Sequence, residues 1–230
     1  MRLLFVASNP MEFRGILQRI QTPRPISLAA DWARAGILAG AETLLVANGV
    51  GRRRAAAAVD AGWKILPADR IISVGYCGAL DPALAIADVV IGTCIADQSR
   101  RHPVLLLTGN AAASGTIRSV DRVVRTAAEK SKLRAEGGIA VEMEAAGVAE
   151  RASALGAPLS CVRSVTDLAG EDLANDFEQA LRSDGHFATM RILRESLRHP
   201  AARIPELIRL QQRCARASRT LGDFFADCRF

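Results

Sequence analysis

The sequence predicts an α/β protein with a doubly wound, mostly parallel central sheet flanked by helices, and two observations carry this prediction. Short apolar runs alternate with amphipathic stretches along the first 187 residues, which is the pattern of strands joined by helical crossovers. The chain of 230 residues, 50% of them hydrophobic, is also long enough to bury one large core. We expect a single domain over residues 1–187 and an appended helical extension over residues 188–230.

Six apolar runs are expected to be buried strands, because each is brief, rich in Val, Ile or Leu, and bounded by Gly, Pro or polar residues. They are Leu3–Ala7, Thr43–Ala47, Ile71–Val74, Val89–Cys94, Ile139–Val141 and Leu159–Val165. Helical patterns lie between them, at about 10–20, 52–64, 119–134 and 144–155.

Ligands of such sheets bind beyond the carboxyl ends of the strands. The loops that follow the expected strands are therefore the first places to search for a site. These loops are Ser8–Glu12, Asn48–Arg54, Gly75–Pro82, Glu142–Glu144 and Thr166–Asp172.

The composition excludes several classes of protein. The five cysteines are odd in number and form no C-x-x-C pair, so neither a disulfide framework nor a zinc site is expected. No apolar run reaches the roughly 18 residues of a membrane span, and Leu3–Ala7 is too short for a signal-peptide core. We expect a cytoplasmic protein without a metal or another cofactor.

Most of the basic charge lies in the C-terminal segment. The net charge is +6, and residues 191–230 hold nine Arg against four acidic residues. Apolar positions such as Leu207, Ile208 and Phe224 recur there at helical spacing, which indicates a basic amphipathic helix. Such a helix packs on its own domain or on another subunit, or it makes peripheral contact with the inner membrane surface. Nucleic acid is the least expected partner, since aromatic residues are only 4% of the chain.

The segment Asn48–Arg54 contains two glycines and opens a helix after a strand, where backbone N–H groups bind anions. Arg54 stands where a dinucleotide fingerprint needs a third glycine, and no Lys-Ser/Thr pair ends the segment as in a phosphate-binding loop. An anion site and a tight turn with solvated arginines remain the two interpretations. The glycines of the Gly75–Pro82 loop likewise suit either close approach of a ligand or a turn.

Acidic residues follow two of the expected strands. Glu142 and Glu144 flank Met143 at the start of an Ala-rich helix, and Asp167 ends the next strand. Acids in the first turn of a helix are commonly only favourable partners of its dipole. Three carboxylates at one sheet edge are nevertheless costly to desolvate unless a ligand or a reaction uses them.

Four motifs together resemble the purine nucleoside phosphorylase and methylthioadenosine/S-adenosylhomocysteine nucleosidase superfamily. They are Val141–Ala145, Ser164–Asp167, the Gly75–Leu80 loop and the Gly49–Arg52 turn, in order over about residues 1–180. The segments 119–130 and 181–200 look most like the hopanoid-biosynthesis-associated phosphorylase subgroup, whose implied substrate is adenosylhopane. The resemblance implies a homo-oligomeric enzyme that cleaves the N-glycosidic bond of an adenosine-type nucleoside.

The same resemblance implies roles for individual residues. Asp167 matches the acid that protonates the purine at N7, a step typically worth about 10²–10⁴-fold in rate. Glu144 matches the acceptor of the ribose hydroxyl hydrogen bonds, and Met143 matches the methionine that lies against the sugar. The full expected set of substrate contacts is Glu142, Met143, Glu144, Cys77, Gly78, Val123 and Val124.

The nucleophile is either water or phosphate. Glu12 matches the glutamate that activates water in hydrolytic members, although it could instead cap the helix that begins near Met11. Ser73 and Tyr76 stand where phosphorylases carry phosphate ligands, so hydrolysis is favoured. A phosphate or anion site of another shape could still use Gly51, Arg52, Arg163 and Tyr76. A noncatalytic membrane-bound or nucleotide-binding module that keeps the fold is the remaining alternative.

Overall fold

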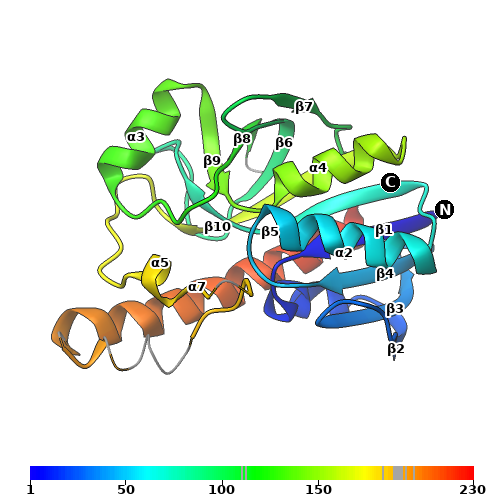
Figure 1. Ribbon diagram of the computed structural model, residues 1–230, viewed down its shortest axis with the longest axis horizontal. Helices are drawn as coiled ribbons and strands as arrows, with labels where there is room; N and C mark the ends of the chain where they lie inside the picture. The colour runs from blue at the N-terminus through cyan, green and yellow to red at the C-terminus, as the bar shows by residue number, and fades with distance from the viewer. Residues whose placement is uncertain (110, 112, 183, 189–193, 195, 199) are drawn as a thin grey trace.

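The computed structural model describes residues 1–109, 111, 113–182, 184–188, 194, 196–198 and 200–230 (Figure 1). The first half of the chain contains β1 (Arg2–Ala7), the 3₁₀ helix η1 (Pro10–Phe13), α1 (Arg14–Leu17), β2 (Gln21–Pro25), β3 (Trp32–Leu38), β4 (Ala41–Ala47), α2 (Arg52–Ile65), β5 (Arg70–Ala79), β6 (Val89–Ala96) and β7 (Arg101–Pro103). The second half contains β8 (Ala113–Ser119), α3 (Ala127–Ala135), β9 (Gly138–Glu142), α4 (Ala145–Ala154), β10 (Leu159–Asp167), α5 (Phe177–Ala180) and α7 (Pro200–Asp227).

All the described strands belong to one sheet. Its order is β10-β6-β8-β9-β5-β1-β4-β3-β2, with β7 beside β6, and β10 also pairs with β5. Strands β5, β10, β6, β8 and β9 therefore close into a ring at one end of the sheet. The central pairs β4–β1, β1–β5 and β5–β10 are parallel, whereas β5–β9 and β10–β6 are antiparallel. The pairs β6–β8 and β8–β9 are also parallel. The prediction of a doubly wound α/β sheet is confirmed, with parallel pairs on both sides of the antiparallel β5–β9 contact.

All six expected strands are present, and each is longer than the sequence pattern indicated. Strand β5 continues to Ala79 and β10 to Asp167, so Tyr76, Cys77 and Gly78 lie within a strand rather than in a loop. The helix expected over 119–134 was partly wrong. Ser119 still belongs to β8, and α3 begins after Thr126, whose side chain accepts a hydrogen bond from the Glu129 N–H in a capping box.

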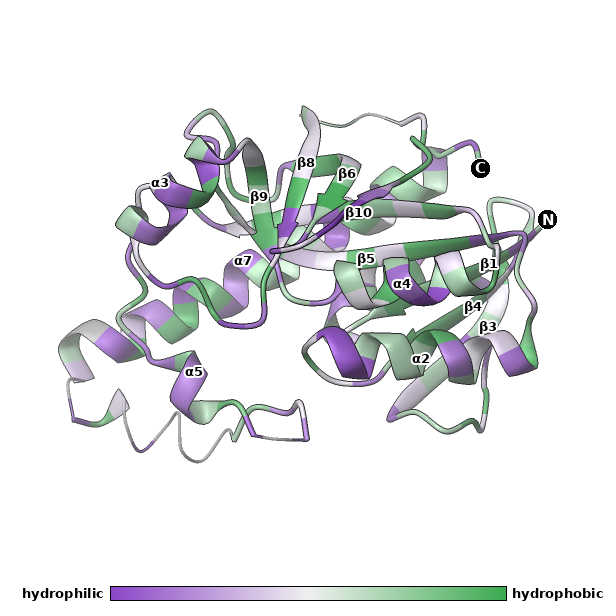
Figure 2. Ribbon diagram, turned by 45° about the horizontal axis from the view of Figure 1, so that its top comes forward, coloured by the Kyte–Doolittle hydropathy of each residue, from purple (hydrophilic) through white to green (hydrophobic). Residues whose placement is uncertain are grey.

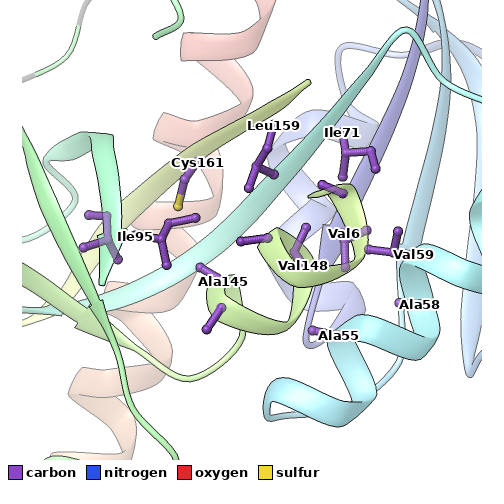
Figure 3. Packing of buried hydrophobic residues seen from close by; sticks show 14 of the residues in the cluster. Val6, Ala55, Ala58, Val59, Ile71, Ile95, Ala145, Val148, Leu159 and Cys161 are labelled. Carbon is purple, nitrogen blue, oxygen red and sulfur yellow. The ribbon is translucent and has the colours of Figure 1, made fainter. Parts of the chain in front are cut away.

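Helices α2 and α4 pack together over one face of the sheet (Figure 3). Val59 of α2 and Val148 of α4 are buried in the same hydrophobic cluster as strand residues such as Val6. The two helices approach closely because α4 carries Gly147 at the contact. A Cβ atom at Gly147 would lie 2.0 Å from the Arg52 carbonyl oxygen, so a larger residue would push the helices apart.

Helices α1 and α7 cover the opposite face. The Phe225 ring packs edge to face on Phe5 of β1, with 5.0 Å between ring centroids, and Leu221 and Phe224 join the same buried cluster. Figure 2 shows hydrophobic and hydrophilic residues alternating along α7. The expected C-terminal helix spans Pro200–Asp227, and its C-terminal half is part of the core of the domain. Residues 189–193, 195 and 199 of the expected extension lie outside the described residues. Within the described residues, no helix has the length and apolar character needed to cross a membrane.

Candidate active site

The topology brings the sequence-predicted residues to the carboxyl ends of four neighbouring strands. Glu12 follows β1, Glu142 ends β9 and Asp167 ends β10. Strand β5 lies between the other three and pairs with each of them. Its residue Gly78 is paired with both Val141 and Asp167, so the ends of β9 and β10 meet beside it.

Glu12 is buried, and four donors hold its carboxylate. The Oε2 atom accepts hydrogen bonds from the Ser8 N–H, the Ser8 hydroxyl and the Asn9 N–H, each at 2.8 Å. The Oε1 atom accepts one from the Tyr76 N–H at 2.9 Å. Through Asn9, Glu12 also completes the capping box of η1. Glu12 therefore both caps the helix and presents Oε1 to β5, so the two interpretations of its position are compatible.

Gly75 makes room for this carboxylate. A Cβ atom at position 75 would lie 2.4 Å from Glu12 Oε1 and 3.1 Å from Arg163 Nη1. Any side chain at this position would collide with one or both groups. The glycine therefore serves close approach of two charged side chains to the strand.

Arg163 is 1% exposed and lies between the carboxylates. Its Nη2 atom donates to Glu142 Oε2 at 2.6 Å and to the Ser73 hydroxyl at 2.7 Å. Burial opposes its charge, but the neighbouring carboxylates outweigh burial, Glu142 most of all, and raise the pKa of Arg163 further. Glu142 Oε1 and Arg163 Nε are buried without a hydrogen-bond partner among the described residues.

Glu144 completes what we call the carboxylate cluster, which consists of Glu12, Glu142, Glu144 and Arg163. Its Oε1 atom accepts a hydrogen bond of 2.9 Å from the Gly51 N–H, at the start of α2. Burial, together with the charges of Glu142 and Glu12, raises the pKa of Glu144 to about 8. The Gly51 N–H of the expected anion site is therefore taken by a carboxyl group of the chain itself, and that group holds a proton near neutral pH.

The residues of the expected anion site do not all meet. Gly51 and Arg163 belong to the carboxylate cluster, but Arg52 stands apart from it. The Arg52 guanidinium pairs with Glu150 of α4 and lies 3.0 Å from Asp97 Oδ2. The Tyr76 hydroxyl donates to the Met11 carbonyl oxygen at 3.2 Å, and burial raises the pKa of Tyr76.

Asp167 is 9% exposed and lies beside Gly78 of β5. Its Oδ1 atom lies 3.2 Å from the Thr166 hydroxyl, and its Oδ2 atom lies 2.6 Å from Lys130 Nζ. A Cβ atom at Gly78 would lie 2.8 Å from Asp167 Oδ2, so this glycine too is required by a carboxylate. Burial raises the pKa of the neighbouring Cys77 thiol well above its usual range, and Cys77 contributes packing rather than charge.

Asp167 lines one cavity, and the expected contact Val124 lines another. One, of about 190 Å³, lies between the end of β10 and α7 and is lined by Asp167, Glu171, Asp172, Leu173, Glu206, Arg209, Leu210 and Arg213. The other, of about 380 Å³, is lined by Gln98, Arg118, Val120, Asp121, Arg122, Val124, Leu133 and Glu136. In the described part of the chain, no three His, Cys, Asp or Glu residues are grouped so as to hold a metal ion.

The remaining expected contacts lie near the ends of β8 and β9. Val124 is buried with Leu80 and Val141, close to the end of β9. The Val123 N–H donates to Glu178 Oε2 of α5 at 2.7 Å. Met143 is partly buried between the two glutamates.

Sequence reasoning missed Lys130, which is fully buried in α3. It is separated from Asp167 by more than thirty residues, and no local pattern marks it. The only signal in the sequence is its rarity, because the chain contains just three lysines. Sequence reasoning also missed Ser8, the residue that supplies two of the four donors to Glu12.

The fold and this arrangement define a class of α/β proteins with acidic side chains gathered at the carboxyl ends of parallel strands. The family model described as the phosphorylase superfamily matches residues 5–112 and 104–196. The chain belongs to this superfamily, as the four sequence motifs indicated.

Similar proteins carry one recurrent description. The 5'-methylthioadenosine/S-adenosylhomocysteine nucleosidase of Pseudoalteromonas translucida is 24% identical, over 80% of this chain and 91% of the relative. The crystal structure of the Neisseria meningitidis nucleosidase of the same name, in complex with methylthio-immucillin-A, has a TM-score of 0.72 and 22% identity, covering 98% of each chain. An S-adenosylhomocysteine nucleosidase from Streptococcus pyogenes, in complex with 5-methylthiotubericidin, has a TM-score of 0.73 and 18% identity, covering 99% of this chain and 97% of the other.

Proposed function

We propose that this protein is a nucleosidase that hydrolyses the N-glycosidic bond of an adenosine-type nucleoside. The observation that carries this proposal is that the carboxylate cluster and Asp167 gather around the carboxyl end of β5, Glu12 and Arg163 against Gly75 and Asp167 against Gly78. Cleavage of such a bond needs an acid for the leaving base, negative charge near the cationic sugar, and a base for the nucleophile. The residues present supply all three, and the names of the similar proteins agree with this chemistry.

In the proposed reaction, Asp167 donates a proton to N7 as the C1′–N9 bond breaks and its electron pair moves into the purine. The ribosyl cation that forms is stabilised by the carboxylate cluster, in which three acidic groups share one Arg163. Glu12 accepts a proton from water, and the water oxygen bonds to C1′. Among the described residues Glu12 Oε1 accepts only the Tyr76 N–H bond, which leaves a lone pair for that proton.

Water is preferred to phosphate as the nucleophile because the candidate cations are already paired. Arg163 is matched by Glu142, and Arg52 is matched by Glu150 and Asp97. Glu144 occupies the Gly51 N–H at the start of α2. A phosphate dianion in this region would have to displace a carboxyl group or compete with one.

The test is release of adenine from adenosine and methylthioadenosine in phosphate-free buffer and in phosphate. Equal rates are expected in the two buffers. Strict dependence on phosphate would show that the enzyme is a phosphorylase and not a nucleosidase. Binding of adenine with no turnover of any nucleoside would favour the noncatalytic alternative.

We further propose a hydrophobic, hopanoid-like 5′ substituent and peripheral contact of α7 with the inner membrane surface. Ile204 and Ile208 lie one turn apart on α7 and are 37% and 52% exposed. Exposed Arg209 and Arg216 follow them along the helix, which suits a surface of anionic lipid. In flotation with anionic vesicles, the Ile204→Glu, Ile208→Glu double variant should lose binding. The matched control is Ile65→Glu at the end of α2, which is 51% exposed on the other side of the sheet and should still float.

Self-association is also proposed, as the resemblance to the superfamily implies. Leu105 and Leu106 are adjacent in sequence and are 48% and 61% exposed, and neighbouring exposed leucines commonly mark an interface. Sedimentation of the wild type should show a dimer or a larger assembly, and Leu106→Glu should shift it toward the monomer. A monomeric wild type would contradict this proposal.

A further inference from the structure

Lys130 is a buried cation next to the expected acid of the reaction. Its side chain is 0% exposed, and its Nζ atom lies 2.6 Å from Asp167 Oδ2. The same Nζ atom donates to the carbonyl oxygens of Leu168, at 2.7 Å, and of Glu171, at 3.2 Å. The three acceptors match the three N–H bonds of an ammonium group, so the charged form of Lys130 is fully satisfied here.

A lysine suits this position better than an arginine. The other ion pairs described for this chain have Arg or His as the cation. A guanidinium is planar and donates in a fixed fork, whereas an ammonium is compact and donates in three directions. Only the ammonium can reach one carboxylate oxygen and two carbonyl oxygens of the 167–171 segment from a single atom.

The contacts of the two Asp167 oxygens differ. Lys130 holds Oδ2, whereas Oδ1 lies 3.2 Å from the Thr166 hydroxyl. That hydroxyl has one hydrogen and also lies 3.3 Å from the Cys77 carbonyl oxygen. When it donates to Cys77, its oxygen can accept a proton carried on Oδ1. The Lys130 ammonium occupies Oδ2, so a proton that Asp167 takes up from solvent and passes to the base is carried on Oδ1.

We infer that Lys130 is the positioning residue of the acid: it fixes Asp167 through Oδ2 and leaves Oδ1 to donate the proton to the purine. This inference rests on the proposed nucleosidase function. As the Oδ1–H bond breaks and the N7–H bond forms, negative charge grows on Asp167 beside the Lys130 ammonium. That charge is stabilised in the transition state more than in the ground state, which accelerates the step.

The experiment is a double-mutant cycle on adenine release from adenosine, with Lys130→Met, Asp167→Asn and the combination. Lys130→Met should lower kcat/KM about 10²-fold in the wild type and have little further effect in the Asp167→Asn background, because its effect passes through Asp167. Lys132→Met is the matched control, since Lys132 lies on the same helix and is exposed. It should leave the rate unchanged.

A second substrate separates proton donation from folding. The leaving group of 4-nitrophenyl β-D-ribofuranoside departs without a proton, so its hydrolysis should change less than about threefold in Lys130→Met. Lys130→Gln, which keeps N–H donors without the charge, is measured in parallel, with thermal unfolding of each variant. Equal losses in both Asp167 backgrounds, or no loss on adenosine, would overturn the role of Lys130. Absence of base release by the wild type would instead overturn the proposed function.

Discussion

The carboxylate cluster and the Asp167–Lys130 pair treat buried charge in different ways. In the carboxylate cluster, three acidic groups share one Arg163, and burial together with the charges of Glu142 and Glu12 raises the pKa of Glu144 to about 8. Asp167, in contrast, has the cation of Lys130 to itself. An unbalanced cluster suits a place where positive charge develops on a sugar, and a balanced pair suits a place where a proton moves. Each substitution below changes the carboxylate cluster, the Asp167–Lys130 pair or the neighbouring Arg52, and the largest expected effect comes first.

Asp167→Asn should remove most of the activity on adenosine. An amide cannot donate the proton of a carboxylic acid to N7, and general acid catalysis is typically worth about 10²–10⁴-fold. The measurement is kcat/KM for adenine release under substrate-limited conditions. A fully active variant would refute the assignment of Asp167 as the acid.

Glu12→Gln should lower kcat about 10²-fold, because an amide cannot accept the proton of water. The amide N–H₂ would also face the donors of Ser8 or Tyr76, and an unsatisfied buried donor costs about 1–3 kcal/mol of stability. Turnover and urea unfolding should both be followed. Loss of stability with unchanged turnover would reduce Glu12 to a helix cap.

Glu144→Gln should flatten the dependence of stability on pH. The pKa of Glu144 is raised from 4.5 to about 8, so between these values the folded chain holds a proton that the unfolded chain has released. The free energy of unfolding therefore falls as pH rises through this window. Urea unfolding at pH 5 and pH 8 should show a smaller decrease for Glu144→Gln than for the wild type. An identical decrease would show that the Glu144 carboxyl is not protonated in the fold.

Arg52→Ala should have the smallest effect on catalysis, within about threefold, because Arg52 pairs with Glu150 and Asp97 away from the cluster. The Asp97 side chain is only 4% exposed, and a buried carboxylate that loses its nearest cation should lower the free energy of unfolding by about 1–3 kcal/mol. Adenine release in the presence and absence of phosphate measures the first effect. If the rate depends on phosphate and Arg52→Ala abolishes that dependence, Arg52 belongs to an anion site as the sequence predicted.

The sequence predicted those parts of the site that depend on strand ends. Runs of Val, Ile and Leu located the strands, and parallel strands bring their carboxyl ends to one edge, so Glu12, Glu142 and Asp167 could be grouped without coordinates. The partners of Arg163 could not be predicted in this way. Its pairing with Glu142 depends on the antiparallel contact of β9 with β5, which no local pattern specifies.

For the C-terminal helix, too, the sequence predicted the element but not its tertiary contacts. Its amphipathic pattern was visible, but the pattern does not state what the apolar side meets. In the structure Phe225 stacks with Phe230 and packs on Phe5 of the first strand, a contact between the two ends of the chain. Lys130 is the clearest failure, because a lysine near the start of a helix usually stays in solvent, and only the fold turns this one inward.

The glycines of β5 set a constraint on how this site can vary. Gly75 lies against Glu12 and Gly78 lies against Asp167, and three residues of strand span about 10 Å. The separation of the two carboxylates is therefore fixed by backbone geometry and not by flexible side chains. Changes elsewhere can alter which substrate is bound, whereas insertion or deletion of one residue between these glycines would separate acid from base and end the reaction.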